Sequence, residues 1–291
     1  MGRQSRVKRE RREEKEAQRR RIIRLSTFGA EHGCLFCREN SQKFTSQEHV
    51  FPESMGNTEL VIPPGVVCDR CNNNVLSQLD QTICDFGPVA MRRTMLGVKS
   101  KTGKIPRFRF SEGTLEHHPS DDGSEPRLIV SQSSKRDVLR EISRTADGEV
   151  KLEWSSHGGR RMTARYASEL SRALLKSALE CVWIDHGKVA LEQRFDHVRE
   201  AVLGKPRDGY FVMATQADPT CTQASLSYFL LPDQEANLTR VPVFANYYGV
   251  MMMTDSHDAT PRMAVPPKQA SVLTFSGEAR GDVVVDSIED V

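Results

Sequence analysis

The longest regular hydrophobic pattern in the chain covers residues 163–184. Apolar side chains recur there at helical spacing and form one stripe: Ala167, Leu170, Leu174, Ala178 and Val182. A stripe with this period is typical of an amphipathic helix that packs one face on a core. Gly187 follows as the predicted C-terminal stop, because glycine readily adopts the left-handed conformation that ends many helices.

Five other segments beyond residue 90 are predicted as strands: 127–132, 149–154, 210–215, 226–231 and 243–253. Residues 111–126 are rich in Asp, Gly, Ser and Pro and are predicted as a loop, and residues 99–104 are predicted as a basic turn. These elements together predict an α+β domain over residues 105–265, followed by a tail over residues 266–291.

A shorter pattern precedes this domain, in residues 27–95. A short strand is predicted over 44–50, and an apolar segment over 61–67, broken by Pro63, Pro64 and Gly65, follows as a turn. A helix is then expected to start near Asn72, with three apolar residues on one face: Val75, Leu79 and Ile83. The predicted order is strand, loop, a Cys-x2-Cys knuckle at residues 68–71, and helix.

Composition agrees with a soluble globular protein of two domains. The chain has 291 residues, of which 38% are hydrophobic and 27% charged. No apolar run approaches the roughly 20 residues of a membrane span, so no membrane association is expected.

The net charge of +2 is distributed unevenly. Residues 1–25 hold eleven Lys or Arg against four Glu, which gives this segment +7 and leaves −5 for the remaining chain. This basic N-terminal arm, residues 1–26, has no continuous apolar face. This arm either binds nucleic-acid phosphates electrostatically or is a solvated tail. The arginines predicted to contact nucleic acid are Arg9, Arg12, Arg19, Arg20 and Arg21.

Four of the seven cysteines form two Cys-x2-Cys pairs, Cys34/Cys37 and Cys68/Cys71. Four thiolates suit a closed tetrahedral zinc site of the structural kind, and the alternative is buried thiols without metal. The other three cysteines are scattered and no secretory leader is evident, so a reducing, cytoplasmic location is expected. Arg70, inside the second pair, is predicted either to touch phosphate or to remain solvated.

A different cluster lies between the cysteine pairs. Glu48 and His49 are adjacent and precede Pro52, and Asn72 directly follows the last cysteine of the pairs. An acid, an imidazole and an amide oxygen suit a hard metal ion, a base and a phosphate. Asn72 can instead cap the following helix, although Asn73 can fill that role equally well.

These motifs, in this order, resemble those of the HNH endonucleases: Cys-x2-Cys, Glu-His-Val-x-Pro, Gly-Asn and Cys-x2-Cys-Asn-Asn. The resemblance covers about residues 34–80, in the subgroup of that family with zinc knuckles. It implies a ββα-metal fold, with His49 as general base and with Glu48 and Asn72 as ligands of a catalytic Mg²⁺ or Mn²⁺. Pro63 stands where the family usually has a middle Asn, and either Asn57 replaces that residue or none does.

The chemistry of phosphodiester hydrolysis asks for the same residue types. An imidazole with an ordinary pKa near 6.5 can deprotonate water close to neutral pH. A divalent cation neutralises the charge that develops on the phosphate and the leaving oxygen. Neighbouring strand residues point to opposite faces, so Glu48 and His49 can converge only if the strand ends beside them.

The sequence therefore predicts an α+β protein in which a small zinc-stabilised HNH module precedes an α+β domain. The predicted function is metal-dependent endonuclease cleavage of nucleic acid, most simply DNA. The alternative is a non-catalytic zinc module that binds nucleic acid or a protein partner.

Overall fold

The computed structural model describes these parts of the chain: residues 28–110, 113–118, 127–132, 142–144, 150–152, 164–205, 211–216, 221, 224–232, 239–255, 270–277, 283–284 and 288–290. The predicted basic arm, residues 1–26, lies outside the described residues. The described part is mixed helix and strand, which confirms the predicted α+β class.

Short elements build the N-terminal module, residues 28–95. In chain order they are α2 (Phe28–His32), β1 (Glu48–His49), the 3-10 turn η1 (Glu53–Met55), β2 (Val61–Ile62), the π-helical turn η2 (Cys71–Leu76), α3 (Ser77–Asp85) and α4 (Gly87–Met95). β1 and β2 pair antiparallel, with Glu48 opposite Ile62 and His49 opposite Val61. The module therefore has two strands followed by a helix, the order that the resemblance implies. The turn predicted in the apolar segment before Pro63 is wrong at β2.

The helix predicted from residue 72 corresponds to η2 and α3. Leu79 and Ile83 are buried, as the apolar face requires, and Val75 is partly buried. Helix α4 was not predicted, because its inward side includes Arg93 and Thr94, which interrupt the hydrophobic period.

A small antiparallel sheet follows α4. It contains β3 (Phe108–Phe110), β4 (Gly113–His118) and β5 (Arg127–Gln132), in that order. The strand predicted at 127–132 is thus confirmed as β5. The loop predicted over 111–126 is wrong at β4, whose six residues pair with β3 and β5 on either side. A separate hairpin joins β6 (Ile142–Arg144) and β7 (Val150–Leu152), the latter within the predicted strand 149–154.

Seven antiparallel strands form the main sheet, in the order β15-β14-β9-β12-β13-β8, with β16 also paired to β14. They are β8 (Phe211–Gln216), β9 (Ala224–Phe229), β12 (Val243–Tyr247), β13 (Val250–Asp255), β14 (Ala270–Gly277), β15 (Val283–Val284) and β16 (Ile288–Asp290). A short pair, β10 (Leu231–Pro232) with β11 (Thr239–Arg240), lies beside it. The segment predicted as a tail, 266–291, thus contributes strands, and β14 pairs with β9 along six residues.

The single strand predicted at 243–253 is wrong, since the chain reverses in its middle. β12 and β13 form a hairpin joined by Tyr248 and Gly249. Both residues have positive φ, 47° and 91°. Two positive values in a two-residue connection match the twist of antiparallel strands. Apolar residues on both sides of this turn conceal it in the sequence.

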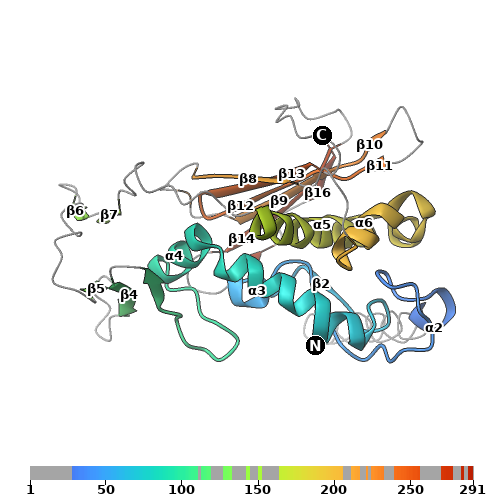
Figure 1. Cartoon of the computed structure of the whole chain (residues 1–291), viewed down its shortest axis with the longest axis horizontal. Coiled ribbons are helices and arrows are strands. Elements are labelled where there is room, and N and C mark those ends of the chain that lie inside the picture. Colours follow the sequence, from blue (N-terminus) through green and yellow to red (C-terminus); the bar gives the residue numbers. More distant parts are fainter. Residues whose placement is uncertain are drawn as a thin grey trace, which may run out of the picture.

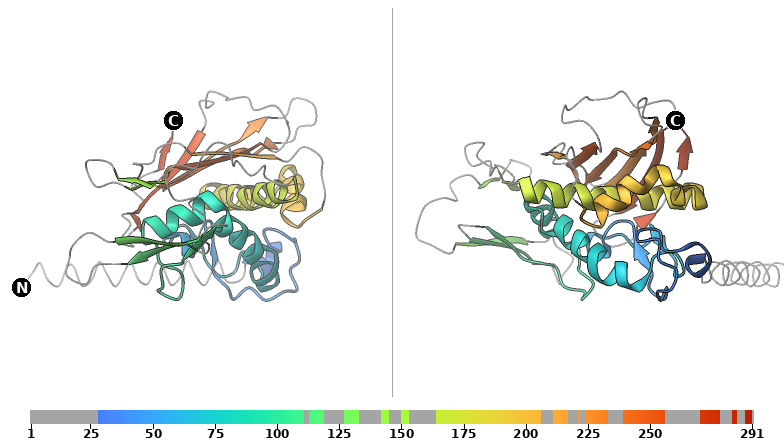
Figure 2. Two further views of the ribbon diagram at one scale, coloured as in Figure 1. Left: turned by 60° about the vertical axis from the view of Figure 1, so that its left-hand side comes forward. Right: turned by 45° about the vertical axis from the view of Figure 1, so that its right-hand side comes forward.

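Helix α5 (Ala164–His186) is the predicted long helix, and Gly187 follows with φ 57° as its stop. Three shorter helical elements come next: η4 (Gly187–Leu191), η5 (Gln193–Phe195) and α6 (Asp196–Val202). The main sheet lies on one side of α5, and α3 and α4 of the N-terminal module lie on the other (Figures 1 and 2). Lys176 and Glu180, outside the predicted stripe, are buried as well, because α5 is covered on both sides.

One continuous cluster of buried apolar side chains joins the three layers, from Phe28 in α2 through Leu174 in α5 to Met252 in β13. The N-terminal module therefore shares its core with the C-terminal sheet. Among the helices described, none combines the length and the apolar character that crossing a bilayer requires.

Candidate active site

The four paired cysteines converge on one point, although 30 residues separate the two pairs. The Sγ atoms of Cys34, Cys37, Cys68 and Cys71 all lie within 4.8 Å of one another. The Sγ atoms of Cys37 and Cys68 are 3.7 Å apart. A tetrahedron with Zn–S bonds of about 2.3 Å has edges of about 3.8 Å, so the spacing fits zinc.

Backbone amides support this cluster. The N–H groups of Phe36 and Cys68 donate to Cys34 Sγ at 3.4 and 3.3 Å, and the Cys71 N–H donates to Cys68 Sγ at 3.4 Å. Donors directed at sulfur favour the thiolate form that zinc requires. The arrangement is that of a closed structural zinc knuckle.

Asp69 links the second cysteine pair to the chain that enters β1. Its carboxylate accepts hydrogen bonds from the backbone N–H groups of Thr45 and Ser46, both at 2.8 Å, and from the Thr45 hydroxyl at 2.7 Å. Burial is the largest single influence and raises the pKa of Asp69, but these hydrogen bonds together outweigh it and hold the pKa below its ordinary value. The sequence analysis did not single out Asp69, although an Asp at a helix start is a usable signal.

Asn72 also holds the strand. Its Nδ2 donates to the backbone carbonyl of Gln47 at 2.9 Å, directly before Glu48. Neither Asn72 nor Asn73 caps the helix, because the helix already starts at Asp69 and the Asn72 N–H donates to Cys68 O as an interior residue does. The predicted cap role is therefore wrong, and Asn72 is placed beside the acid–histidine pair.

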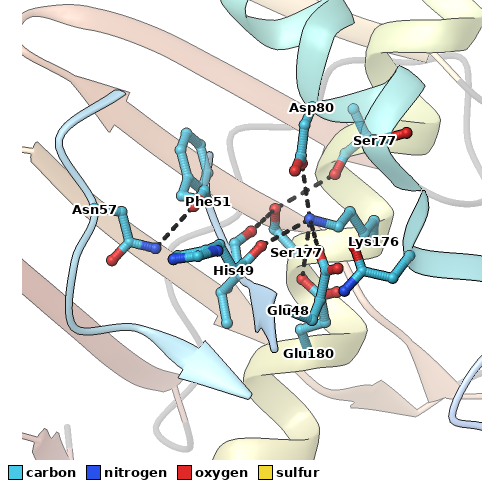
Figure 3. A network of polar contacts seen from close by, with 12 residues as sticks. Glu48, His49, Phe51, Asn57, Ser77, Asp80, Lys176, Ser177 and Glu180 are labelled. Carbon is cyan, nitrogen blue, oxygen red and sulfur yellow. Dashed lines mark hydrogen bonds and ion pairs between the residues drawn. The ribbon is translucent and has the colours of Figure 1, made fainter. Parts of the chain in front are cut away.

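Glu48 and His49 point to opposite sides of β1 (Figure 3). The Glu48 side chain is 3% exposed and is directed at α5, whereas the His49 side chain is 18% exposed. This is the ordinary alternation of a strand, and the ladder with β2 enforces it. The two side chains therefore do not converge on one point.

His49 lies in a partly desolvated position near a surface carboxylate. Its Nε2 is 4.0 Å from Oε2 of Glu53, four residues further along the chain. Burial lowers the pKa of His49 below its ordinary value of 6.5, and the opposing attraction of Glu53 is smaller. The imidazole is therefore neutral near pH 7 and able to accept a proton.

Glu48 instead takes part in a buried ionic cluster around Lys176 of α5. Lys176 Nζ lies 2.7 Å from Glu48 Oε1, 2.8 Å from Asp80 Oδ1 of α3, and 3.6 Å from Glu180 Oε2. The same ammonium donates to the backbone carbonyl of His49 at 2.8 Å. One fully buried cation thus joins β1, α3 and α5.

Three carboxylates share this one ammonium, and burial penalises their charge. It raises the pKa of Glu48 even though Lys176 opposes the change, and it raises the pKa of Glu180 well above the ordinary value. Burial alone would lower the pKa of Lys176, but Asp80, Glu180 and Glu48 together hold it well above its ordinary value. The three carboxylates therefore keep Lys176 charged, and burial favours the protonated form of Glu180.

The predicted ligands of a catalytic cation, Glu48 and Asn72, have suitable chemistry, since Mg²⁺ takes one or two carboxylates and keeps several waters. The Glu48 carboxylate, however, already faces the Lys176 ammonium in a dry environment. Glu48 can bind a divalent ion only by exchanging that ammonium for it. As they lie, the two residues form no open cation site.

Asn57, one candidate for the missing middle Asn, makes its hydrogen bonds to backbone groups. Its Nδ2 donates to the carbonyls of Phe51 and Leu60, at 2.8 and 3.0 Å, and its Oδ1 accepts from the N–H groups of Glu59 and Leu60. The residue is completely buried. It closes the loop that follows His49 and fixes that backbone (Figure 3).

Other side chains from the second half of the chain bind backbone carbonyls of the N-terminal module. Ser177 Oγ donates to Val50 O at 2.6 Å, Tyr247 OH to Met55 O at 3.0 Å, and Arg199 Nε to Leu35 O at 2.9 Å. Sequence analysis missed these residues and Lys176. The one signal was the Lys176/Glu180 pair at i, i+4, which ordinarily indicates a solvated helix face.

Arg70, the remaining predicted contact to nucleic acid, is exposed between Cys68 and Cys71. The other predicted arginines, Arg9, Arg12, Arg19, Arg20 and Arg21, lie outside the described residues. Their roles stay predictions.

The knuckle, the ββα order and the acid–histidine pair are the features that a family comparison can test. Residues 34–85 match the family model for HNH endonucleases. The match begins at the first cysteine of the knuckle and ends with α3, so it covers the segment that carries all the residues of the predicted centre. Comparison with curated proteins and with solved structures gave no match. We refer to residues 34–85 as the HNH segment.

Proposed function

We propose that this protein is a metal-dependent HNH endonuclease that hydrolyses phosphodiester bonds, with DNA as the substrate. The observation that carries the proposal is the environment of His49. It is a half-buried, neutral imidazole on β1 of an HNH segment whose zinc knuckle is geometrically complete. This combination supports a general base held on a rigid scaffold.

In the proposed reaction, His49 accepts a proton from a water molecule as that water oxygen bonds to the phosphorus. The bond from phosphorus to the leaving oxygen breaks, and the leaving oxygen takes a proton from solvent. Glu53, 4.0 Å from His49 Nε2, stabilises the imidazolium that forms. Lys176 holds the backbone at the residue itself, through His49 O, and Asn57 holds it two residues later, through Phe51 O. When bound, a divalent cation would neutralise charge on the phosphate.

Glu48 and Asn72 remain our proposed ligands for that cation, Mg²⁺ or Mn²⁺. For Glu48 this requires the ammonium exchange described above. The proposed basic arm and Arg70 would add sequence-independent affinity for the nucleic-acid backbone. A cytoplasmic location stays a prediction that follows from the cysteine usage.

Incubation of the full chain with supercoiled plasmid tests the proposal. We expect Mg²⁺ or Mn²⁺ to support nicked or linear products and EDTA to stop them. His49→Ala should lower the rate on the order of 10²–10⁴-fold, the usual effect of removing a general base. His186→Ala is the matched control, because His186 is exposed at the end of α5.

A specific observation favours a second candidate, a non-catalytic zinc module that binds nucleic acid or protein. The carboxylate expected to hold the catalytic ion is buried and paired with Lys176. Retained DNA binding without cleavage in any divalent ion, and identical behaviour of wild type and His49→Ala, would favour this second function.

A further inference from the structure

The predicted basic turn, residues 99–104, belongs to a larger group of exposed cations that has no role in the proposed reaction. Between Asp85 and Glu112 the chain has no acidic residue. Five cationic residues in this interval are exposed: Lys99, Lys101, Lys104, Arg107 and Arg109. We call these five residues the basic track. Two other arginines of the interval point inward, since Arg93 is 6% exposed and Arg92 Nε donates to Tyr248 O.

Internal hydrogen bonds give the turn a defined shape. The Ser100 N–H and hydroxyl both donate to Lys104 O at 2.9 Å, and the Gly103 N–H donates to Ser100 O at 2.8 Å. Gly103 has φ 75°, which the turn needs and glycine permits. The turn projects from the end of α4, on the side away from the main sheet (Figure 1).

The track continues with Arg107, directly before β3, and with Arg109 on β3. Arg107 and Arg109 are exposed, while Phe108 between them is partly buried and lies opposite buried Leu115 of β4. Residues two apart share one face of a strand, so both arginines face solvent together. Thr94 Oγ1 donates to Pro106 O at 3.0 Å, which fastens this part of the chain to α4.

Turn and sheet enclose a hollow of about 320 Å³. Lys99, Lys104 and Arg107 line it, together with three residues of β4: Glu116, His117 and His118. Glu116 is the acidic residue among these, and its oxygens lie 3.3 Å from Arg107 Nε and 3.3 Å from His118 Nε2. One carboxylate among three fixed cations leaves the hollow with a positive balance.

The track begins at the proposed base. Lys101 Nζ lies 3.7 Å from Glu53 Oε2, the same oxygen that is 4.0 Å from His49 Nε2. From this point the cations continue through the turn to Arg107, directly before β3, and to Arg109 on β3. A nucleic-acid strand with one phosphate at His49 would place its neighbouring phosphates along this line of cations.

We propose that the basic track binds the phosphodiester backbone of the substrate next to the bond that is cut. Lysine and arginine side chains at the surface neutralise phosphates and release the counterions condensed on nucleic acid. Such contacts orient the strand and carry no base information. This inference rests on the proposed nuclease function, for which it supplies the substrate-positioning surface.

Binding measurements in the His49→Ala background separate this proposal from catalysis. The test variant is Lys101→Gln with Lys104→Gln in the full chain. The matched control is Lys188→Gln with Lys205→Gln, which removes the same charge from two exposed lysines that follow α5 and α6. The probes are a fluorescein-labelled DNA duplex and an RNA of the same sequence, each titrated at several salt concentrations.

We expect the track variant to bind more weakly than the control and to show a smaller salt dependence. With one phosphate lost per lysine, the slope of log K against log salt falls by about 1.8. The ratio of control to track-variant affinity then shrinks about twelvefold between about 50 and 200 mM salt. Zinc content should not differ between the two variants.

Equal affinities and equal slopes of log K against log salt for the two variants would overturn the proposal that the basic track binds phosphates, whether or not the wild type cleaves DNA. Failure of the parent to bind either probe would overturn it as well. Conversely, a binding defect confined to the track variant supports the track even if the wild type proves unable to cleave, in which case only the proposed nuclease function fails.

Discussion

The Lys176 ammonium donates a hydrogen bond to the backbone carbonyl of His49 at 2.8 Å, across 127 residues of sequence. The HNH segment and helix α5 are therefore joined at the residue proposed as the base. Lys176 also pairs with Glu48 and Asp80, so the strand and helix of the segment meet at one side chain from outside it. The proposed active site thus depends on the second half of the chain for its geometry.

Lys176→Met should destabilise the protein severely. It leaves Glu48 and Asp80 without their buried counter-charge, and breaking a buried ion pair from one side costs about 3–5 kcal/mol. Urea denaturation at pH 7 measures the change in the free energy of unfolding. Lys188→Met, at an exposed position in η4, is the control, and similar losses for both variants would contradict the role of Lys176.

Glu180→Gln should stabilise the folded protein relative to wild type, and the gain in unfolding free energy should depend on pH. Burial raises the pKa of Glu180 above its ordinary value of 4.5, so the carboxyl ionises more easily in the unfolded chain. Wild type therefore loses stability relative to the variant as the pH rises above about 4.5, by at most about 1.4 kcal/mol per pH unit. Denaturation of both proteins between pH 5 and pH 8 checks this. A difference that does not change with pH would show that Glu180 is ionised in the folded protein.

Cleavage by wild type should stay active below the pH at which an ordinary histidine protonates. Because the pKa of His49 lies below 6.5, the neutral base persists under mildly acidic conditions, and activity falls only as the pH drops through that lowered value. Glu53→Gln removes an interaction that raises the pKa of His49, so it should move this acidic limb to still lower pH. The pH profile of kcat/KM measures both. An acidic limb above 6.5 in wild type would argue against His49 as the base.

Asn57→Ala should loosen the loop that follows His49. The variant loses four hydrogen bonds to backbone groups, and each buried group left unsatisfied costs about 1–3 kcal/mol. We expect a loss of at least about 2 kcal/mol in unfolding free energy. Asn73→Ala, at an exposed position of η2, serves as the control and should change stability little.

One zinc per chain is expected, bound by Cys34, Cys37, Cys68 and Cys71. Structural zinc contributes on the order of 10 kcal/mol to folding, so Cys68→Ser should leave the HNH segment unfolded. The Cys221→Ser variant, changed outside the four-cysteine cluster, should retain its zinc. Elemental analysis and circular dichroism test both variants, and folded wild type without zinc would rule out the knuckle.

Local patterns predicted α5 and its glycine stop well, because a helix with a long apolar stripe is specified by residues close in sequence. Local patterns failed where two strands follow each other within one continuous apolar segment. Residues 243–253 read as one strand, and only the positive φ angles of Tyr248 and Gly249 reveal a hairpin. They failed again at Lys176 and Glu180, whose spacing indicates a solvated pair but which are buried between two layers.

The sequence by itself determined the chemistry available in the HNH segment: four thiols at knuckle spacing, an acid beside a histidine, and an asparagine after the last cysteine of the knuckle. Cysteine spacing can be read directly, since each Cys-x2-Cys turn is local and a four-thiol site needs two of them. Only the tertiary structure decided where each side chain points. The β1–β2 ladder turns Glu48 inward to Lys176 and leaves His49 beside Glu53. The inward position of Glu48 depends on α5, which contacts β1 only when distant parts of the chain bury a common core. No local sequence pattern predicts which side chains will face each other across that contact.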